Sequence, residues 1–232
     1  MQLKLKLTVV AAIAAVAGMA SAQEQVVKIG HVAPMSGPQA SYGKDNENGA
    51  RMAIEELNAQ GVTIGGKKIK FELQAEDDAA DPKQGTAAAQ KLCDAKVAGV
   101  IGHFNSGTAI PASKIYEDNQ IPNIAMATSP TLSAQGFKYV FRSMTSDSQQ
   151  GTVLGKYAVE KLGYKKIAII DDRTAYGQGL ADEFEKSAKA AGATILPRQF
   201  TNDKASDFQS ILTSFKTEQP DVIFYGGADT QS

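Results

Sequence analysis

The stretch VAGVIGHFNSGTAIPASKIYEDNQIPNIAMA, residues 97–127, decides the fold class. Residues 97–102 and 121–127 are short apolar segments that predict strands, and residues 107–118 between them have the spacing of a helix. Two strands joined by a helical crossover run parallel in one sheet. This stretch therefore predicts a β-α-β unit of an α/β protein.

The same alternation extends to the N-terminal side of this unit and just beyond it. Asp81 before Pro82 marks a helix start, and Gly61 marks a helix end. We expect strands at 26–32, 68–75 and 139–144, and helices at 42–59 and 82–95. Together these elements predict a doubly wound parallel sheet, covered by helices on both faces, over residues 23–145.

The pattern then restarts. We expect helices at 146–162, 175–191 and 206–215, and strands at 166–171, 194–200 and 222–225. Residues 167–170 are continuously apolar, which is typical of a central parallel strand. The sequence therefore predicts a second doubly wound lobe over residues 146–232. Because few strands are predicted for it, we expect this second lobe to be incomplete in the chain.

The N-terminus has the features of a signal peptide. Lys4 and Lys6 precede an apolar run at 7–17, and Ala20-Ser21-Ala22 provides the small residues that signal peptidase reads. The run is too short to span a membrane, and the alternative is a buried N-terminal helix. We expect residues 1–22 to be removed on export, which would place the mature protein in the periplasm.

Composition and charge bear on the kind of partner and on the cysteine chemistry. The 232 residues carry a formal net charge of -1, with 43% hydrophobic and 21% charged residues. These values are ordinary for a globular protein and argue against a nucleic-acid partner. Cys93 is the single cysteine, so no internal disulfide can form, and we expect a buried thiol rather than a reactive one.

The sequence also lacks the usual signatures of cofactor and enzyme sites. The two histidines, His31 and His103, have no second ligand residue at metal-binding spacing, so no metal site is expected. No glycine-rich dinucleotide or phosphate motif and no Gly-x-Ser-x-Gly elbow is present. We therefore expect neither a cofactor nor an enzyme.

The loops at the carboxyl ends of parallel strands are where α/β proteins bind ligands. After the first strand of the quoted stretch, Ser106 lies where a helix begins, and the free N–H groups of that helix suit a carboxylate. Ser106 or Thr108 could instead simply cap the helix. After the second strand, the hydroxyl of Thr128 could bind the other carboxylate oxygen, or it could form an ordinary turn before Pro130.

Three further residues near strand ends are candidates. Tyr42 could wall the cleft or belong to the core. Tyr176 lies beyond the strand at 166–171, on the side of the second lobe. Asp229 follows Gly226-Gly227 and could pair with an ammonium group, with an exposed loop carboxylate as the alternative.

Short motifs lie in and around these loops, each weak alone and specific together. They occur in the following order: Met35-Ser36-Gly37-Pro38 with Tyr42-Gly43, Asp77-Asp78, Asp81-Pro82-Lys83-Gln84, Ile101-Gly102-His103, Pro111-Ala112-Ser113, Ile115-Tyr116-Glu117-Asp118, Phe141-Arg142, Asp147-Ser148 with Gln150-Gly151, Tyr176-Gly177 with Gly179-Leu180-Ala181, and Tyr225-Gly226-Gly227. By these motifs the sequence resembles the branched-chain amino acid (leucine/isoleucine/valine) binding proteins of bacterial ABC importers, which have the two-lobed type I periplasmic binding protein, or Venus-flytrap, fold. Members of that family are longer, so the resemblance implies a C-terminally truncated chain.

The resemblance implies which residues meet the ligand. Ser106 and Thr128 would bind the α-carboxylate. The carbonyl of Met126 would accept from the α-ammonium, and Asp229 would pair with it. Tyr42, Phe104 and Asn105 would line the side-chain pocket, and Ala127 would lie against it. Tyr176 would close over the ligand from the second lobe.

Two departures from the family pattern bear on ligand choice. Some members have a disulfide at the positions occupied here by Ala80 and Asn105, and leucine-binding members have a tyrosine where Ala228 stands. Asn105 also adds a polar group near the side-chain pocket. This leaves room for a small or polar amino acid beside the branched-chain ones.

The resemblance implies a monomeric binding protein that is not an enzyme. It would close on a free amino acid, with leucine, isoleucine and valine as the first candidates, and deliver it to the membrane permease of an ABC importer. Two alternatives stay open. One is a sensor or binding protein of the same fold for amides, urea or another small polar solute. The other is a hydrolase using Ser106 or Thr128, for which no general base is visible.

Overall fold

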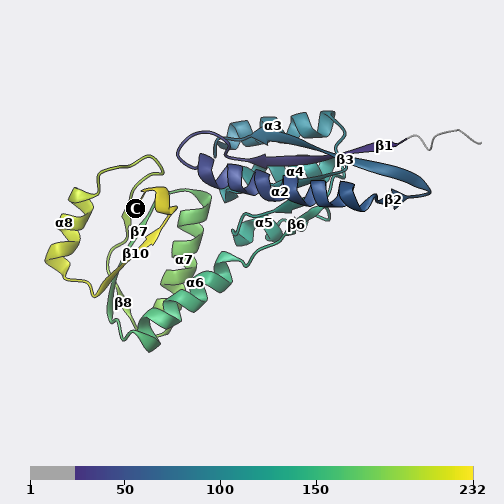
Figure 1. The fold of residues 1–232 in the computed structure, drawn as a ribbon. Helices are drawn as coiled ribbons and strands as arrows, with labels where there is room; N and C mark the ends of the chain where they lie inside the picture. Colours follow the sequence, from purple (N-terminus) through teal and green to yellow (C-terminus); the bar gives the residue numbers. More distant parts are fainter. Residues whose placement is uncertain (1–23, 232) are drawn as a thin grey trace, which may run out of the picture.

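The protein is built on two β-sheets, each flanked by helices (Figure 1). The structure is a computed structural model that describes residues 24–231, so the predicted signal peptide lies outside the described residues. Among these residues no helix has the length and apolar character needed to cross a membrane. The predicted α/β architecture with two parallel-sheet lobes is confirmed.

The first sheet has six strands in the order β2-β3-β1-β4-β5-β6. Its strands are β1 (Gln25–Ala33), β2 (Thr63–Ile64), β3 (Lys67–Asp77), β4 (Gly99–Gly102), β5 (Asn123–Ala125) and β6 (Val140–Arg142). All neighbouring pairs are parallel except β2 and β3, which form a hairpin. The hairpin turns at Gly65 and Gly66, whose φ angles of 58° and 79° favour glycine.

Helices cover the first sheet from both sides. They are α2 (Ala40–Gln60), α3 (Pro82–Asp94), α4 (Ser106–Asp118) and the short α5 (Pro130–Ala134), which the sequence patterns do not predict. Val32 of β1 packs in the core cluster with α3 and α4, whereas its neighbour His31 lies near Glu47 and Arg51 of α2. Because successive strand residues face opposite ways, α2 covers the face opposite α3 and α4.

The predicted helix ends of the first lobe are found in the structure. The Asp81 carboxylate accepts hydrogen bonds from the backbone N–H groups of Lys83 and Gln84, both at 2.9 Å, and Pro82 is the first helical residue. Gly61 ends α2 in the left-handed conformation with φ 68°. These local signals therefore set where α2 ends and α3 begins.

The second sheet centres on β7 (Lys166–Asp171) and is parallel throughout. The other strands are β8 (Thr194–Ile195), β9 (Gln199–Phe200) and β10 (Val222–Gly226), and the helices are α6 (Asp147–Lys156) with a π-helical continuation (Tyr157–Lys161), α7 (Ala175–Ala190), α8 (Gln209–Glu218) and a terminal 3-10 turn (Asp229–Gln231). β7 is buried along nearly its whole length, as its apolar run predicts.

Two predicted elements of the second lobe differ in the structure. The predicted strand at 194–200 is split into β8 and β9, which pair with opposite ends of β7. Pro197 lies in the gap and has no N–H to donate to the ladder. The predicted helix at 206–215 begins at Gln209, whose N–H is accepted by the Asp207 carboxylate, and it continues to Glu218.

Helices α6 and α7 pack in backbone contact. A Cβ atom added at Gly151 would lie 2.7 Å from the backbone nitrogen of Phe184, and one added at Gly155 would lie 2.8 Å from its carbonyl oxygen. Real Cβ atoms do not approach other atoms this closely. Only glycine at these two positions therefore permits the observed helix spacing.

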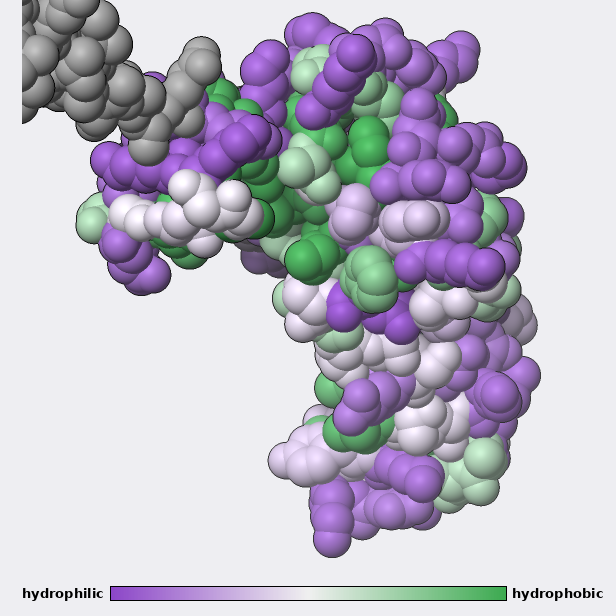
Figure 2. All heavy atoms as spheres, turned by 90° about the vertical axis from the view of Figure 1, so that its right-hand side faces the viewer, coloured by the Kyte–Doolittle hydropathy of each residue, from purple (hydrophilic) through white to green (hydrophobic). Residues whose placement is uncertain are grey.

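Part of the first sheet carries exposed apolar residues. Ile124 of β5 and Phe141 of β6 are paired in register and are 46% and 53% exposed. Figure 2 shows hydrophobic residues gathered, between hydrophilic margins, in the upper part of the molecule that contains this sheet. Among residues 24–231, no helix covers Ile124 and Phe141.

Candidate functional site

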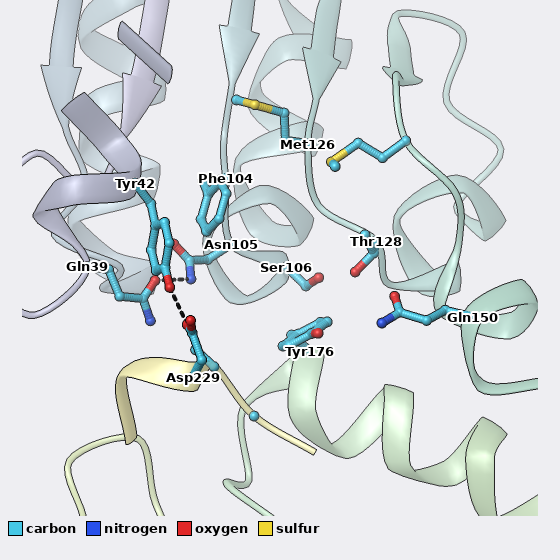
Figure 3. A pocket seen from close by; sticks show the side chains of 13 residues that line it. Gln39, Tyr42, Phe104, Asn105, Ser106, Met126, Thr128, Gln150, Tyr176 and Asp229 are labelled. Carbon is cyan, nitrogen blue, oxygen red and sulfur yellow. Dashed lines mark hydrogen bonds between the residues drawn. The ribbon is translucent and has the colours of Figure 1, made fainter. Parts of the chain in front are cut away.

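A cavity of about 450 Å³ lies between the carboxyl edge of the first sheet and the second lobe (Figure 3). This volume is within the range of small-molecule sites. Its lining residues come from both lobes: Gln39, Tyr42, Phe104, Asn105, Ser106, Met126, Thr128, Met144, Gln150, Tyr176, Gly227, Ala228 and Asp229. A ligand held here would touch both halves of the protein.

The structure brings together all the site residues named from the sequence except Ala127. Ala127 is 1% exposed and packs in a core cluster with Ala109, Ala125 and Leu132. Its neighbours Met126 and Thr128 both line the cavity. Ala127 therefore supports the loop from behind rather than bordering the cavity.

The N-terminus of α4 forms one wall. Asn105 is the N-cap residue but makes no capping side-chain bond, and Ser106 begins the helix. The first N–H groups of a helix have no partner within it, and they suit an anion. The Oγ atom of Ser106 accepts a hydrogen bond from the backbone N–H of Ser129 at 3.2 Å, which ties the two strand-end loops together.

Buried polar contacts hold this loop from below. His103 is fully buried, with Nδ1 2.8 Å from the Asp78 carboxylate and Nε2 3.1 Å from the Tyr116 hydroxyl. Burial raises the pKa of Tyr116, so its hydroxyl stays protonated. His103 is therefore a core residue whose two ring nitrogens both have partners, and it positions the chain that leads to Phe104.

The Thr128 loop is tied to the start of the second lobe. The Thr128 carbonyl accepts from the backbone N–H of Asp147, the first residue of α6, at 2.9 Å. Burial raises the pKa of the Asp147 carboxyl, while the neighbouring Thr128 side chain and the charge of Arg142 act in the opposite direction. The Ser129 carbonyl accepts from the Arg142 guanidinium at 3.0 Å.

Aromatic residues and Asp229 form another part of the cavity wall. The rings of Tyr42 and Phe104 stack at a centroid distance of 5.6 Å and an interplanar angle of 16°. The Tyr42 hydroxyl donates to the Asp229 carboxylate, and this hydrogen bond raises the pKa of Tyr42. Tyr42 belongs to α2 and Asp229 follows β10, so the contact bridges the two lobes.

Several lining residues were not expected from the sequence as ligand contacts, among them Gln39, Met144 and Gln150. Gln39 is 9% exposed, and its Oε1 accepts a hydrogen bond from Asn105 Nδ2 at 2.7 Å. It lies in the loop after β1, which the strand-end rule nominates, but its residue type carries no further signal. Gln150 hydrogen-bonds Tyr176, whose pKa is raised mainly by burial. Gln150 lies on α6 and lines the cavity. Its neighbours in the sequence do not reveal that this helix borders the cavity.

The site offers hydrogen-bonding and charged groups from both lobes. Within the described chain, no group of three or more His, Cys, Asp or Glu side chains is arranged to hold a metal ion. Cys93 is a buried free thiol in the core of the first lobe, as the sequence predicts. The arrangement can therefore hold a small solute of mixed charge between the two lobes.

Comparison with known proteins shows what the chain is similar to. A family model described as periplasmic binding protein matches residues 26–232. The Leu/Ile/Val-binding protein homolog 1 of Brucella abortus is 41% identical over 217 residues, which is 93% of this chain and 58% of that protein. The chain thus spans less than two thirds of the length of this curated relative.

Two solved structures have similar folds. The branched-chain amino acid transporter substrate-binding protein LivJ from Streptococcus pneumoniae, in complex with isoleucine, aligns with a TM-score of 0.76 and 31% identity, over 86% of this chain and 56% of that one. The solute-binding protein of an ABC transporter from Rhodopseudomonas palustris BisB5, in complex with 3,4-dihydroxybenzoic acid, aligns with a TM-score of 0.74 and 29% identity, over 87% and 55% of the respective chains.

Proposed function

This chain belongs to the periplasmic binding protein family, and we propose that it captures a free amino acid in the periplasm and delivers it to the permease of an ABC importer. Leucine, isoleucine and valine are the first candidate ligands, because the Brucella relative is named for them and the Streptococcus protein was solved with isoleucine. No bond is made or broken in this function.

The observation that carries the proposal is the opposite polarity of two walls of one cavity. The N-terminus of α4, with Ser106 and Thr128, suits a carboxylate. The Asp229 carboxylate suits an ammonium group. Figure 3 shows Asp229 and Thr128 on opposite sides of the cavity with Ser106 between them. A zwitterionic α-amino acid head group satisfies both walls at once.

Closure of the two lobes is the mechanism we propose. The first lobe supplies Ser106 and Thr128, and the second supplies Tyr176 and Asp229. A ligand bound to the first lobe gains the contacts of the second only when the lobes close. It therefore shifts the protein toward the closed state by the free energy of those additional contacts. The permease would recognise this closed state.

A second candidate function is a binding protein or sensor for a solute without an ammonium group, such as an amide, urea or an aromatic acid. The Rhodopseudomonas structure supports this second candidate, because that protein has a similar fold and was solved with 3,4-dihydroxybenzoic acid. The polar group of such a ligand would bind at the N-terminus of α4 with Ser106 and Thr128. Asp229 would then face a part of the ligand that carries no positive charge.

A thermal-shift screen of the complete mature protein tests the proposal. The ligands are the twenty common amino acids, urea, short amides and hydroxybenzoates. A ligand at about 100 times its Kd stabilises the native state by about 2.7 kcal/mol and raises Tm. A shift with amino acids, lost in Ser106→Ala and kept in the exposed Ser210→Ala, supports the proposal. Shifts confined to ligands that lack an ammonium group would favour the second candidate.

A further inference from the structure

An amide pair forms part of the cavity wall beside Tyr42. Gln39 immediately precedes α2, and Asn105 immediately precedes α4. Asn105 Nδ2 donates to Gln39 Oε1 at 2.7 Å, and both residues line the 450 Å³ cavity. The pair thus joins two strand-end loops at the cavity, and Figure 3 shows it on the same side of the cavity as Tyr42 and Asp229.

One polar atom of this pair is unsatisfied. Asn105 Oδ1 is buried and meets no hydrogen-bond partner within residues 24–231. A buried carbonyl oxygen without a partner is costly, whereas a donor placed beside it restores the lost bond. An aliphatic ligand side chain brings no donor, and it would also remove water from the neighbouring Gln39 amide. The pair therefore disfavours a purely hydrocarbon side chain.

The rest of the side-chain compartment is apolar. Phe104, Met126 and Met144 also line the cavity. A ligand side chain that fits both surfaces has a short hydrocarbon body and a polar tip. Asn105 Oδ1 needs a donor, and Gln39 Nε2 can supply one, so a hydroxyl or a carboxamide complements the pair through both donor and acceptor.

We infer that Gln39 and Asn105 determine the side-chain specificity of this site, and that they select an amino acid whose side chain carries a hydroxyl or carboxamide over the hydrocarbon side chain of the same shape. The inference rests on the proposed function, because it takes the head-group site formed by Ser106, Thr128 and Asp229 as given. It changes the preferred ligand within that function from branched-chain to polar.

Isosteric ligand pairs test the inference directly. Threonine and valine have the same shape, as do asparagine and leucine, and the members of each pair differ in hydrogen-bonding groups. Isothermal titration of the complete mature protein should give a Kd at least about tenfold lower for the better polar ligand than for its hydrocarbon partner. A site built to hydrogen-bond a ligand group rejects the analogue that lacks it by this much or more.

Two variants assign the preference to the pair. Gln39→Leu and Asn105→Leu should each reduce the polar-to-apolar affinity ratio at least about fivefold, and tighter valine or leucine binding would accompany the loss. Gln90→Leu, an exposed glutamine on α3, is the matched control and should leave the ratio unchanged. If Asn105→Leu fails to fold, as judged by circular dichroism, Gln39→Leu alone decides the test.

The outcomes separate the inference from the proposed function. Binding of valine or leucine more tightly than their polar partners by the wild-type protein overturns the inference and leaves the proposed function standing. A polar preference that survives both variants also overturns it, because another group would then be responsible. Absence of binding by every amino acid overturns the proposed function itself.

Discussion

The Tyr42 hydroxyl donates a hydrogen bond to the carboxylate of Asp229, 187 residues further along the chain. Tyr42 lies on α2 of the first lobe, and Asp229 begins the 3-10 turn after β10 of the second. The bond therefore forms only when the two lobes are close together. It places the carboxylate proposed to bind the ligand ammonium against the aromatic stack of Tyr42 and Phe104.

Removing this contact should weaken ligand binding through lobe closure. Tyr42→Phe keeps the stacked ring and deletes only the hydroxyl. We expect Kd for the best amino acid ligand to rise about three- to tenfold, as for the loss of one ordinary hydrogen bond, because this bond is exposed to solvent, and most of the change should be in the dissociation rate. Stopped-flow fluorescence and titration calorimetry measure both. Tyr157→Phe, on an exposed tyrosine, should change neither.

Replacing the Asp229 carboxylate should lower the affinity only for ligands that carry an ammonium group. Asp229→Asn keeps the shape and removes the charge, so we expect affinity for an amino acid to fall about tenfold or more. Affinity for the same molecule without its amino group should stay unchanged or increase. Calorimetry with both ligands tests this, with the exposed Asp203→Asn as control. Equal losses for the two ligands would show that Asp229 does not meet the ammonium.

The buried contacts beneath the α4 loop should contribute to stability. Tyr116→Phe removes the hydroxyl that lies 3.1 Å from His103 Nε2 and leaves that nitrogen buried without a partner. We expect the free energy of unfolding to fall by about 1–3 kcal/mol. Urea denaturation checks this value, and the exposed Tyr157→Phe should stay within about 0.5 kcal/mol of wild type. A change in Tyr116→Phe no larger than in the control would contradict the role assigned to the contact.

His31 should make stability depend on pH. Burial lowers the pKa of His31 below 6.5, and Glu47 and Asp78 oppose this while Arg51 and His103 add to it. In the window between the lowered folded pKa and 6.5, the unfolded chain binds a proton that the folded protein does not. The free energy of unfolding therefore falls as pH drops through 6.5, by at most about 1.4 kcal/mol per pH unit from this residue.

A variant isolates this contribution. Both ring nitrogens of His31 are buried and find no hydrogen-bond partner among the described residues, so His31→Leu removes no such bond. Urea denaturation at several pH values from 8 to 5.5 should show a smaller loss of stability on acidification in His31→Leu than in wild type. Identical slopes for the two proteins would mean that His31 titrates alike in the folded and unfolded states.

Local chemistry explains which parts of the fold could be predicted from the sequence. The Asp81-Pro82 start of α3 and the Gly61 end of α2 depend on neighbouring residues alone, and both are found where expected. The β-forming residues at 194–200 predict one strand when only their neighbours in the sequence are considered, although Pro197 interrupts the run. Both halves of the run pair with the same strand, β7, and sequence spacing alone does not reveal this.

The same distinction applies to the site. Ser106 and Thr128 follow neighbouring parallel strands, so the sheet topology alone predicts that they lie close together at the ligand-binding edge of the sheet. The sequence does not mark Gln39 or Gln150 as a ligand contact. They become part of the cavity wall through contacts across the fold, the first with Asn105 and the second with Tyr176. Residues of this kind are identified only when the two loops, or the two lobes, are placed against each other.

The glycine contact between α6 and α7 has a consequence for the thermodynamics of binding. Gln150 lies on α6 and Tyr176 at the start of α7, and backbone packing at Gly151 and Gly155 fixes these helices together. The two ligand-facing side chains are therefore carried on one rigid body. When a ligand binds, the two helices lose the freedom to move as one unit relative to the first lobe. The cost in conformational entropy is therefore lower than if α6 and α7 moved independently of each other. More of the energy of their contacts is then available as affinity.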